Sequence, residues 1–441
     1  MEKAGGPTAM LDVKDMQAAQ GQAEGPLIGS PFSKAELDRR LAALRVAMAD
    51  RGLDLCLLST PETIYYLTGL DHWGYFAPHV LIVPPDDSMI LITRAMERVT
   101  VANQVRNAIF EGHGDQETPA DVAIRLLADP GFAGGSAEAS RGAAQVRLAV
   151  TAEAAVEAVG EQASGKLRIG FEAWSAGLPH GLAHALMAGL PQAEWIDIGG
   201  LVDGQRQVKS AEEQSLMRRA ARISDAAALA AIEAIRADAS EAEVAAACVS
   251  AMITAGGVLP GFGPFIRPQS RLGEEHTTWG GGRYRPGEAV FLELSGCYAR
   301  YHAPLGRLIW LGDAPAESMA IAEVCLAAFD AVLGALRPGA LAREVYAAWQ
   351  GVVDAAGLAH YRRHHCGYLV GIGFPPSWTG GNKVTGLRHD SDLEIQAGMS
   401  FHILSWLMDT GRGDYFVSNS VLLTESGPEL LTKTPQTPII R

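Results

Sequence analysis

The sequence contains little cysteine and no excess of positive charge. Its 441 residues include only five cysteines, which show neither Cys-x-x-Cys spacing nor the pattern of a disulfide framework. The 36 Lys and Arg residues are outnumbered by 50 Asp and Glu, which gives a formal net charge of −14. Nucleic acids and anionic membranes are bound through clustered Lys and Arg, and no such run occurs here. These absences predict a protein of the reducing cytoplasm that binds neither nucleic acid nor a membrane.

Two further absences concern targeting and membrane insertion. No uninterrupted apolar run approaches the roughly 20 residues of a membrane span. The N-terminus lacks the basic segment followed by an apolar segment that is typical of a secretory signal. Residues 1–30 are instead rich in Gly, Ala, Gln and Pro, which predicts a flexible arm. Hydrophobic residues make up 48% of the chain, enough for large cores in two or three domains.

Alternating helix and strand signals predict an α/β domain over residues 31–200. Ser33 and Glu36 have the spacing of a capping box, and apolar residues follow at helical spacing as far as about Gly52. Short apolar strands are expected at residues 56–58, 80–83 and 89–92. Residues 201–441 form a second predicted domain.

The second domain is predicted to begin with a long helix and to contain an internal repeat. Ser210 and Glu213 cap a helix of about 25 residues. Residues 239–257 and 340–357 look alike, because each passes from a polar start through Glu-Val into an apolar helix closed by Gly. Strand-like sequence follows both segments, which indicates a weak duplication of a helix–hairpin unit.

Three stretches carry a family resemblance: residues 64–69 (IYYLTG), 301–307 (YHAPLGR) and 367–378 (GYLVGIGFPPSW). Over about residues 34–435 the chain resembles the creatinase/aminopeptidase P-like superfamily (peptidase M24), and its motifs are most similar to those of ectoine hydrolases. The resemblance implies a creatinase-like N-terminal α/β domain followed by a pita-bread catalytic domain. It also implies a homodimer in which the N-terminal domain of one subunit caps the active site of the other.

The positions at which metal-dependent relatives place their ligands are changed in this chain. They read Glu293, Pro304, Tyr368, Leu404 and Ser418. A divalent ion needs at least three converging oxygen or nitrogen donors, which this set does not supply. The resemblance therefore implies an enzyme that uses no metal or other cofactor. It also places the two pocket glutamates of creatinase at Gly306 and Leu404, so creatinase itself fits poorly.

Three residues are the candidate catalytic groups: His276, Glu293 and Tyr368. His276 lies in a polar, Gly-bounded loop, where the resemblance places a catalytic histidine. Glu293 alternates with apolar residues of a buried strand, which indicates either a structural ion pair with Arg307 or Arg300 or a catalytic carboxylate. Tyr368 keeps a hydrogen-bonding group in the loop, as a substrate contact or as a structural hydroxyl.

Six more residues are candidates for substrate binding. Trp378 ends a rigid Pro-Pro loop and is expected to form a wall of the pocket, while Trp73 is expected in the lid, although both are also typical of core packing. Arg94 offers a guanidinium group to a substrate carboxylate. The other three candidates are His302, His365 and His402. His302 is also the expected local partner of Glu293.

These residues predict hydrolysis of a C–N bond, in an amidine or amide, of a small zwitterionic substrate. Either Glu293 attacks the substrate while His276 shuttles protons, or His276 activates water while Glu293 holds the cationic substrate. Other functions stay open: an Xaa-Pro peptidase, a creatinase-like amidinohydrolase, a metal-free lyase, or a non-catalytic binding module.

Overall fold

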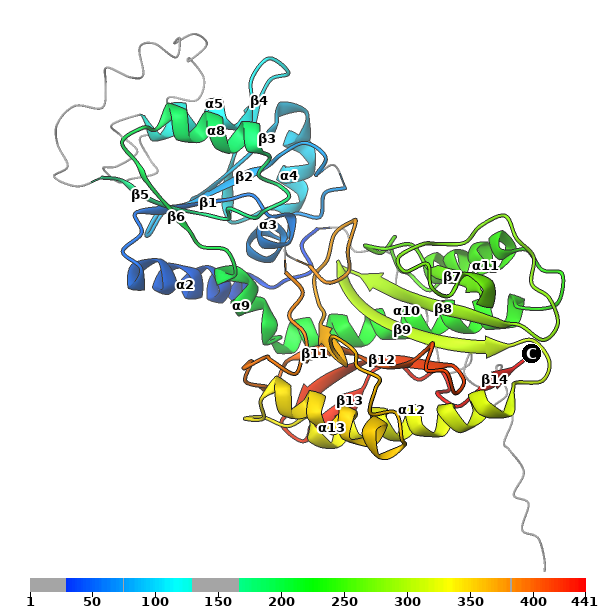
Figure 1. The fold of residues 1–441 in the computed structure, drawn as a ribbon. Helices are drawn as coiled ribbons and strands as arrows, with labels where there is room; N and C mark the ends of the chain where they lie inside the picture. The colour runs from blue at the N-terminus through cyan, green and yellow to red at the C-terminus, as the bar shows by residue number, and fades with distance from the viewer. Residues whose placement is uncertain (1–28, 74, 129–165, 381–382) are drawn as a thin grey trace, which may run out of the picture.

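The computed structural model describes residues 29–73, 75–128, 166–380 and 383–441. Most of the predicted N-terminal arm, residues 1–30, lies outside these ranges. Two β-sheets organise the described residues, one in each half of the chain, and Figure 1 shows the two halves side by side.

The N-terminal half is built on a six-stranded mixed sheet in the order β4-β3-β2-β1-β5-β6. Its strands are β1 (Leu55–Leu58), β2 (Val80–Val83), β3 (Met89–Arg94), β4 (Ala108–His113), β5 (Arg168–Phe171) and β6 (Glu194–Asp197). The accompanying helices are α2 (Lys34–Asp50), α3 (Pro61–Thr68), α4 (Arg98–Gln104), α5 (Pro119–Leu127) and α8 (His180–Gly189). The α/β character and the three strands expected from the sequence are confirmed.

The start of α2 differs from the expected capping box. The Ser33 hydroxyl does accept from the backbone N–H of Glu36 at 3.1 Å, as a helix N-cap should. The Glu36 carboxylate, however, binds Arg39 and Arg40. The Ser33 backbone N–H donates instead to Glu212 of the second domain at 3.0 Å. The reciprocal bond was wrongly predicted because a partner distant in sequence takes its place.

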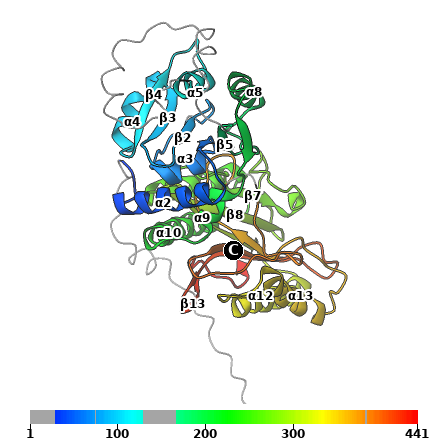
Figure 2. The ribbon, with the colours of Figure 1, turned by 90° about the vertical axis from the view of Figure 1, so that its left-hand side faces the viewer.

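The two halves meet through α9 (Leu201–Gln207) and α10 (Ala211–Ala234), which follow one another along the chain. α2 packs against α9 at this junction (Figure 2). Ser210 and Glu213 form both bonds of the capping box of α10, at 3.3 and 3.0 Å, as the sequence predicted.

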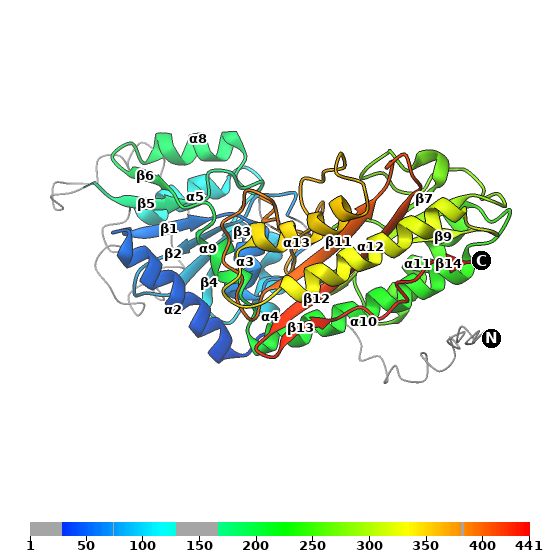
Figure 3. The same cartoon turned by 60° about the horizontal axis from the view of Figure 1, so that its bottom comes forward.

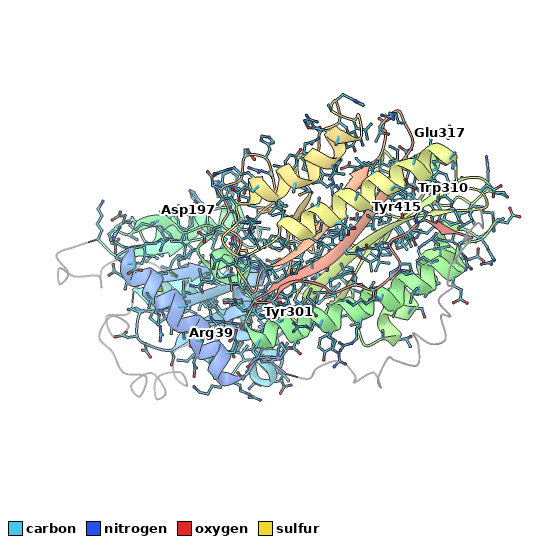
Figure 4. The ribbon with its side chains drawn as sticks, turned by 90° about the horizontal axis from the view of Figure 1, so that it is seen from below. Arg39, Asp197, Tyr301, Trp310, Glu317 and Tyr415 are labelled. Atoms are coloured by element: carbon cyan, nitrogen blue, oxygen red, sulfur yellow. The ribbon has the colours of Figure 1, made fainter. Side chains whose placement is uncertain are left out.

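The C-terminal half contains an eight-stranded sheet whose main path is β10-β11-β12-β9-β8-β7. The strands are β7 (Phe265–Pro268), β8 (Ala289–Tyr298), β9 (Tyr301–Trp310), β10 (Gly367–Leu369), β11 (Ser400–Leu407), β12 (Tyr415–Thr424), β13 (Gly427–Leu430) and β14 (Ile439–Ile440). β9 extends from Tyr301, near the junction with the N-terminal half, to Trp310 at the outer end of the domain (Figure 4).

Two helix pairs cover this sheet. α10 and α11 (Glu241–Thr254) pack on each other, and α10 lies on β8 and β9. α12 (Ala316–Ala335) and α13 (Ala342–Ala355) form the second pair, and α12 lies on β11 and β12 (Figure 3). The two look-alike segments of the sequence are the second helices of these pairs, α11 and α13, and each is followed by strands of the sheet.

α12 is the one helix in the described part of the chain that is long and apolar enough to cross a membrane, by length and composition alone. Glu323 and Asp330 interrupt its apolar sequence, so α12 is not an uninterrupted apolar run of that length. In the structure the side chains of Ile321, Cys325 and Phe329 are buried, and the helix packs on β11 and β12. α12 thus buries one face against the sheet and leaves the other exposed.

Candidate active site

Glu293 lies on the face of β8 that is turned away from α10. Val290, Leu292 and Leu294 pack in the same core cluster as α10, and successive residues of a strand point to opposite faces. The Glu293 side chain therefore points to the other side of the sheet, where it is 9% exposed.

Gly306 is the partner of Glu293 in β9. A Cβ atom at position 306 would lie 2.2 Å from the ring of Phe416 and 2.9 Å from the Ser418 hydroxyl. The space in which the resemblance would place a creatinase glutamate is thus filled by an aromatic ring. This packing agrees with the expectation that creatinase itself is a poor fit.

A chain of hydrogen bonds connects the Pro-Pro loop with β12. Trp378 Nε1 donates to the Tyr368 hydroxyl at 3.0 Å. That hydroxyl lies 2.8 Å from Nδ1 of His402, its register partner on the neighbouring strand. His402 Nε2 lies 2.7 Å from the Ser418 hydroxyl and 3.9 Å from a carboxylate oxygen of Glu293. The Pro-Pro loop and the strands β8, β10 and β12 thus converge on the imidazole of His402.

We assign the tautomer of His402 from the hydrogen bonds around it. The Tyr368 hydroxyl accepts from Trp378 and has a single proton, which we assign to the bond with Nδ1. The proton of the neutral imidazole then resides on Nε2, toward Ser418 and Glu293. Burial keeps the pKa of His402 well below its usual range, and the nearby His365 and Arg307 lower it further. His402 is therefore a neutral hydrogen-bond donor.

Glu293 has the opposite electrostatic character. Burial raises the pKa of its carboxyl group to about 7. The positive charges of Arg267 and Arg363 oppose this shift, whereas the negative charge of Glu275 adds to it. A carboxyl group that titrates near neutral pH exchanges protons readily with a substrate. The pKa values of Glu293 and His402 are thus shifted in opposite directions.

Two arginines beside Glu293 were not identified from the sequence. Arg267 of β7 is only 2% exposed, its guanidinium group stacks over Phe291 at 4.6 Å, and it donates to the carbonyl of Thr277 at 3.3 Å. Arg363 lies 3.8 Å from Glu275. Arg267 stands alone as a charge in an apolar strand, the same signal that pointed to Glu293. Arg363 has no comparable signal.

His276 is exposed and lies beside aromatic residues that contact Trp378. Its ring stacks on Phe262 at 6.0 Å and contacts Phe265 at 5.9 Å. Both phenylalanines in turn contact Trp378, at 4.8 and 5.5 Å. In the described residues no hydrogen bond joins His276 to Glu293. The φ of His276 is 56°, a left-handed conformation that non-glycine residues seldom adopt and that often accompanies functional loops.

His302 lies outside the cluster. It is completely buried, its Nε2 accepts from the backbone N–H of Gly261 at 2.9 Å, and its Nδ1 is 2.9 Å from the carbonyl of Arg300. Burial lowers its pKa to about 3. Both ring nitrogens are therefore occupied by the backbone. On β9 it faces Cys297, which corrects the expectation that it is the local partner of Glu293.

The arginines expected to form an ion pair with Glu293 have other partners. Arg300 binds Asp71 of the N-terminal half at 2.6 Å. Arg307 donates to the carbonyl of Ser418 at 2.7 Å and to the Asn419 side chain at 2.9 Å. The expectation of a structural ion pair with either arginine is wrong, because their guanidinium groups are held by other acceptors.

The remaining predicted binding residues lie at different depths. The ring of His365 is 5.3 Å from that of Tyr368, and burial lowers its pKa to about 3. Trp73, in the N-terminal half, is 58% exposed, and the guanidinium of Arg300 lies 5.1 Å above its ring. Arg94 ends β3 and forms an ion pair with Asp115 at 2.7 Å. The structure thus places His365 beside the cluster, whereas Arg94 belongs to the N-terminal sheet.

The donor set around Glu293 does not fit a divalent metal ion. Within the ranges that the structure describes, no three His, Cys, Asp or Glu residues form a group that could hold one. At the former ligand positions Leu404 and Ser418 are register partners in β11 and β12, and the Tyr368 hydroxyl is bound by Trp378 and His402. Glu293 is the one carboxylate at the five former ligand positions, and a single carboxylate is too few to hold a divalent ion.

Comparison with known proteins identifies both halves of the chain. Residues 40–208 match the Creatinase/Prolidase N-terminal domain, and residues 215–425 match Metallopeptidase family M24. The chain therefore belongs to the creatinase/aminopeptidase P-like superfamily of hydrolases, with a creatinase-like N-terminal domain and a pita-bread catalytic domain.

Individual relatives differ in their chemistry. The ectoine hydrolase of Halomonas elongata is 26% identical over 429 residues, covering 93% of this chain and 98% of that protein. The Xaa-Pro dipeptidase of Pyrococcus horikoshii is 26% identical over 257 residues, covering 58% of this chain and 71% of that protein. The solved Xaa-Pro dipeptidase of Bacillus anthracis superposes with a TM-score of 0.73 at 20% identity, covering 92% of this chain and all of that one. At 20% identity, the similarity to the Bacillus anthracis structure shows a shared fold and nothing further.

Proposed function

We propose that this protein is a metal-independent hydrolase that cleaves a C–N bond in a small zwitterionic amidine or amide, as an ectoine hydrolase does. The observation that carries the proposal is the buried Glu293 carboxyl, with a pKa raised to about 7, beside a neutral His402 at a site whose donors do not fit a metal ion. The similarity to ectoine hydrolase along almost the entire chain supports this choice of substrate class.

Glu293 acts as the general base in the preferred mechanism. Its carboxylate takes a proton from water while the water oxygen bonds to the amidine carbon. The resulting carboxylic acid returns the proton to the departing nitrogen as the C–N bond breaks, which leaves an amide and an amine in the product. His402 and Tyr368 donate hydrogen bonds and hold the site in one arrangement. The alternative, direct attack by Glu293, requires an acyl-type intermediate that water later resolves.

Of the two roles predicted for His276, we retain that of a proton shuttle. Because no hydrogen bond links it to Glu293 in the described residues, and because it lies exposed beside Phe262, we assign it proton transfer between the site and solvent. This role fits an imidazole, which can accept a proton on one ring nitrogen and donate one from the other. Trp378 and the two phenylalanines beside it form an aromatic wall that suits a cationic ring.

The substrate carboxylate needs a cationic partner in this arrangement. Arg363 lies next to Glu275 and above the Trp406 ring at 4.9 Å. Its guanidinium group is suited to bidentate binding of a carboxylate. We propose Arg363 for this role in place of Arg94, which is already paired with Asp115.

Turnover assays on the purified protein test the proposal directly. Ectoine, creatine and an Xaa-Pro dipeptide are offered to enzyme that has been dialysed against EDTA, and products are followed by NMR. Cleavage of the cyclic amidine, unchanged by EDTA, is the expected result. Glu293→Gln should lower kcat by about 10²–10⁴-fold. Glu429→Gln, which alters a surface ion pair with Arg218, is the matched control and should leave kcat unchanged.

Two results would overturn the proposal. One is dipeptide cleavage that EDTA abolishes and manganese restores, which would assign the protein to the peptidases. The other is a Glu293→Gln variant that retains more than a tenth of the wild-type kcat on its true substrate. Mass spectrometry of the His276→Ala variant with substrate separates the two mechanisms, because only direct attack leaves an adduct on Glu293.

A further inference from the structure

A polar pocket lies beside the loop that carries Tyr368 and Trp378. The pocket is open to solvent, and the space within it and at its opening amounts to about 430 Å³. One wall consists of α9 and the residues that lead into α10, and the other consists of residues 369–372 and 379–380. These two short segments directly follow Tyr368 and Trp378 in the sequence. A molecule bound in the pocket would therefore touch both the connection between the domains and the backbone of the active-site loop.

The pocket has an excess of positive charge. Arg206, Lys209 and Lys383 line it, whereas Asp203 is its one acidic residue among those described. Asp203 forms an ion pair with Arg206, so these two charges largely cancel. The charges of Lys209 and Lys383 remain.

Lys209 is almost completely buried, with 5% exposure. Its ammonium group donates to the carbonyl of Gln207 at 3.1 Å, the one hydrogen bond that the described residues give it. An ammonium group has three protons to donate. Gly371 faces it, and a Cβ there would come within 3.1 Å of Lys209 Cε and 3.4 Å of Nζ. The absence of a side chain at position 371 therefore gives the ammonium group room.

Among the residues that the structure describes, Lys209 also has no counter-ion of its own. The carboxylate of Glu213 favours its charge, but it already accepts from Ser210 and Tyr301 and lies 3.6 Å from Arg40. Burial lowers the pKa of Lys209 to about 8, so the group is still mainly protonated at pH 7. A buried charge without a partner is unfavourable, and a bound anion would offset this.

We propose that this pocket binds a small oxyanion, the carboxylate or phosphate group of a metabolite, between Lys209 and Lys383. The site is separate from the proposed hydrolytic centre and serves regulation. A bound anion links the domain connection to residues 369–372, which restrains the loop that holds Tyr368. The backbone N–H of Lys209 already donates to Gly398, just before β11, at 2.8 Å. The ligand thereby acts on two of the elements that build the active site.

Anion titration of the full-length protein tests the site. Inorganic phosphate and acetate are titrated at constant ionic strength, adjusted with sodium chloride, and followed by thermal unfolding and by calorimetry. At least one of the two is expected to raise Tm by a few degrees in a saturable manner, because a ligand that binds only the folded state stabilises it. Saturation by phosphate alone identifies a phosphate ester as the ligand class, and saturation by acetate alone identifies a carboxylate.

Substitutions locate the binding. Lys209→Met should weaken the anion at least tenfold, and Lys383→Met, on the exposed rim, several-fold. Lys34→Met, which removes an exposed lysine paired with Asp38 on α2, is the matched control and should bind as the wild type does. Glu293→Gln should also retain full anion affinity, so a failure of the proposed catalytic role does not affect this measurement.

The proposal is overturned if neither anion gives a saturable shift beyond that of chloride, or if Lys209→Met binds as tightly as the wild type. Should Lys209→Met fail to fold, Lys383→Glu reverses a charge at the solvent-exposed rim and decides the question. Undiminished anion affinity in that variant would also contradict the site.

Discussion

At the scale of single residues, the candidate site depends on two groups whose pKa values move apart. Burial raises the pKa of Glu293 toward neutrality and lowers that of His402 far below it. Near pH 7 the carboxyl group therefore exchanges protons, while the imidazole stays neutral and donates one. Acid–base enzymes commonly separate the roles of neighbouring titratable groups in this way.

The raised pKa of Glu293 predicts a pH-dependent stability. Between the unfolded pKa of about 4.5 and the folded value of about 7 the native state holds more protons than the unfolded state. The free energy of unfolding therefore decreases as the pH rises through this window. Glu293→Gln removes this pH dependence. The free energy of unfolding of the variant, taken relative to that of the wild type, should therefore be higher at pH 8 than at pH 4 by on the order of 3 kcal/mol. Urea unfolding at the two pH values measures it, and an equal difference at both would contradict the buried carboxyl.

Tyr368→Phe tests the hydrogen-bonded chain. The change leaves Trp378 Nε1 and His402 Nδ1 without their partner, which should lower the free energy of unfolding by about 1–3 kcal/mol. Because the His402 tautomer is then no longer fixed, kcat should also decrease by about 10–100-fold. The control is Tyr415→Phe, which removes a hydroxyl bonded to the Gln436 carbonyl at 2.6 Å. It should lose stability without loss of kcat, and equal kcat values for the two variants would contradict the role of Tyr368.

At the scale of helices and strands, local sequence signals sufficed for many elements but not for their contacts. The strands β1 to β3 and the capping box of α10 follow from patterns within a few residues. The bond between Tyr368 and His402 joins residues 34 positions apart and exists because β10 pairs with β11. Periodicity predicts that two strands exist, but not which strand pairs with which. For this reason the sequence predicted Glu293, Tyr368 and His402 as site residues, but neither the bonds between them nor the two arginines beside Glu293.

Gly306 gives an element-scale prediction about the pairing of β9 with β12. Its missing side chain lets the Phe416 ring lie against the strand, with 2.2 Å between a ring carbon and the point that a Cβ atom would occupy. Gly306→Ala forces that ring away and should lower the free energy of unfolding by about 1–3 kcal/mol. Gly334→Ala, in α12 with no atom near its Cβ position, should instead be neutral or stabilising by up to about 1 kcal/mol. Urea titrations compare the two, and an unchanged Gly306→Ala would contradict the close packing.

At the scale of the whole molecule, the N-terminal half helps to position the active-site loop. The backbone N–H of Phe374 donates to Glu62 of α3 at 3.2 Å, and the Tyr75 ring contacts Phe374 at 5.0 Å. Arg300 lies over the same phenylalanine at 4.8 Å while it binds Asp71. The loop that ends in Trp378 is thus packed between the two domains, so the N-terminal domain supports the site as well as the fold.

The exposed aromatic residues next to this junction lead to the last prediction, a homodimer that completes the site. Trp73 is 58% exposed and Phe76 is 85% exposed, and large apolar side chains gathered on a surface favour association. We propose that they contact a second copy of the chain. Light scattering at micromolar concentration should give twice the chain mass of 46.7 kDa. The double variant Trp73→Ser/Phe76→Ser should shift the population to monomer and raise KM, because the partner's contribution to the site is lost. Trp174→Ser, at a tryptophan that is 80% exposed elsewhere in the same half, is the control and should stay dimeric. A wild-type protein that is monomeric at this concentration would contradict a shared site.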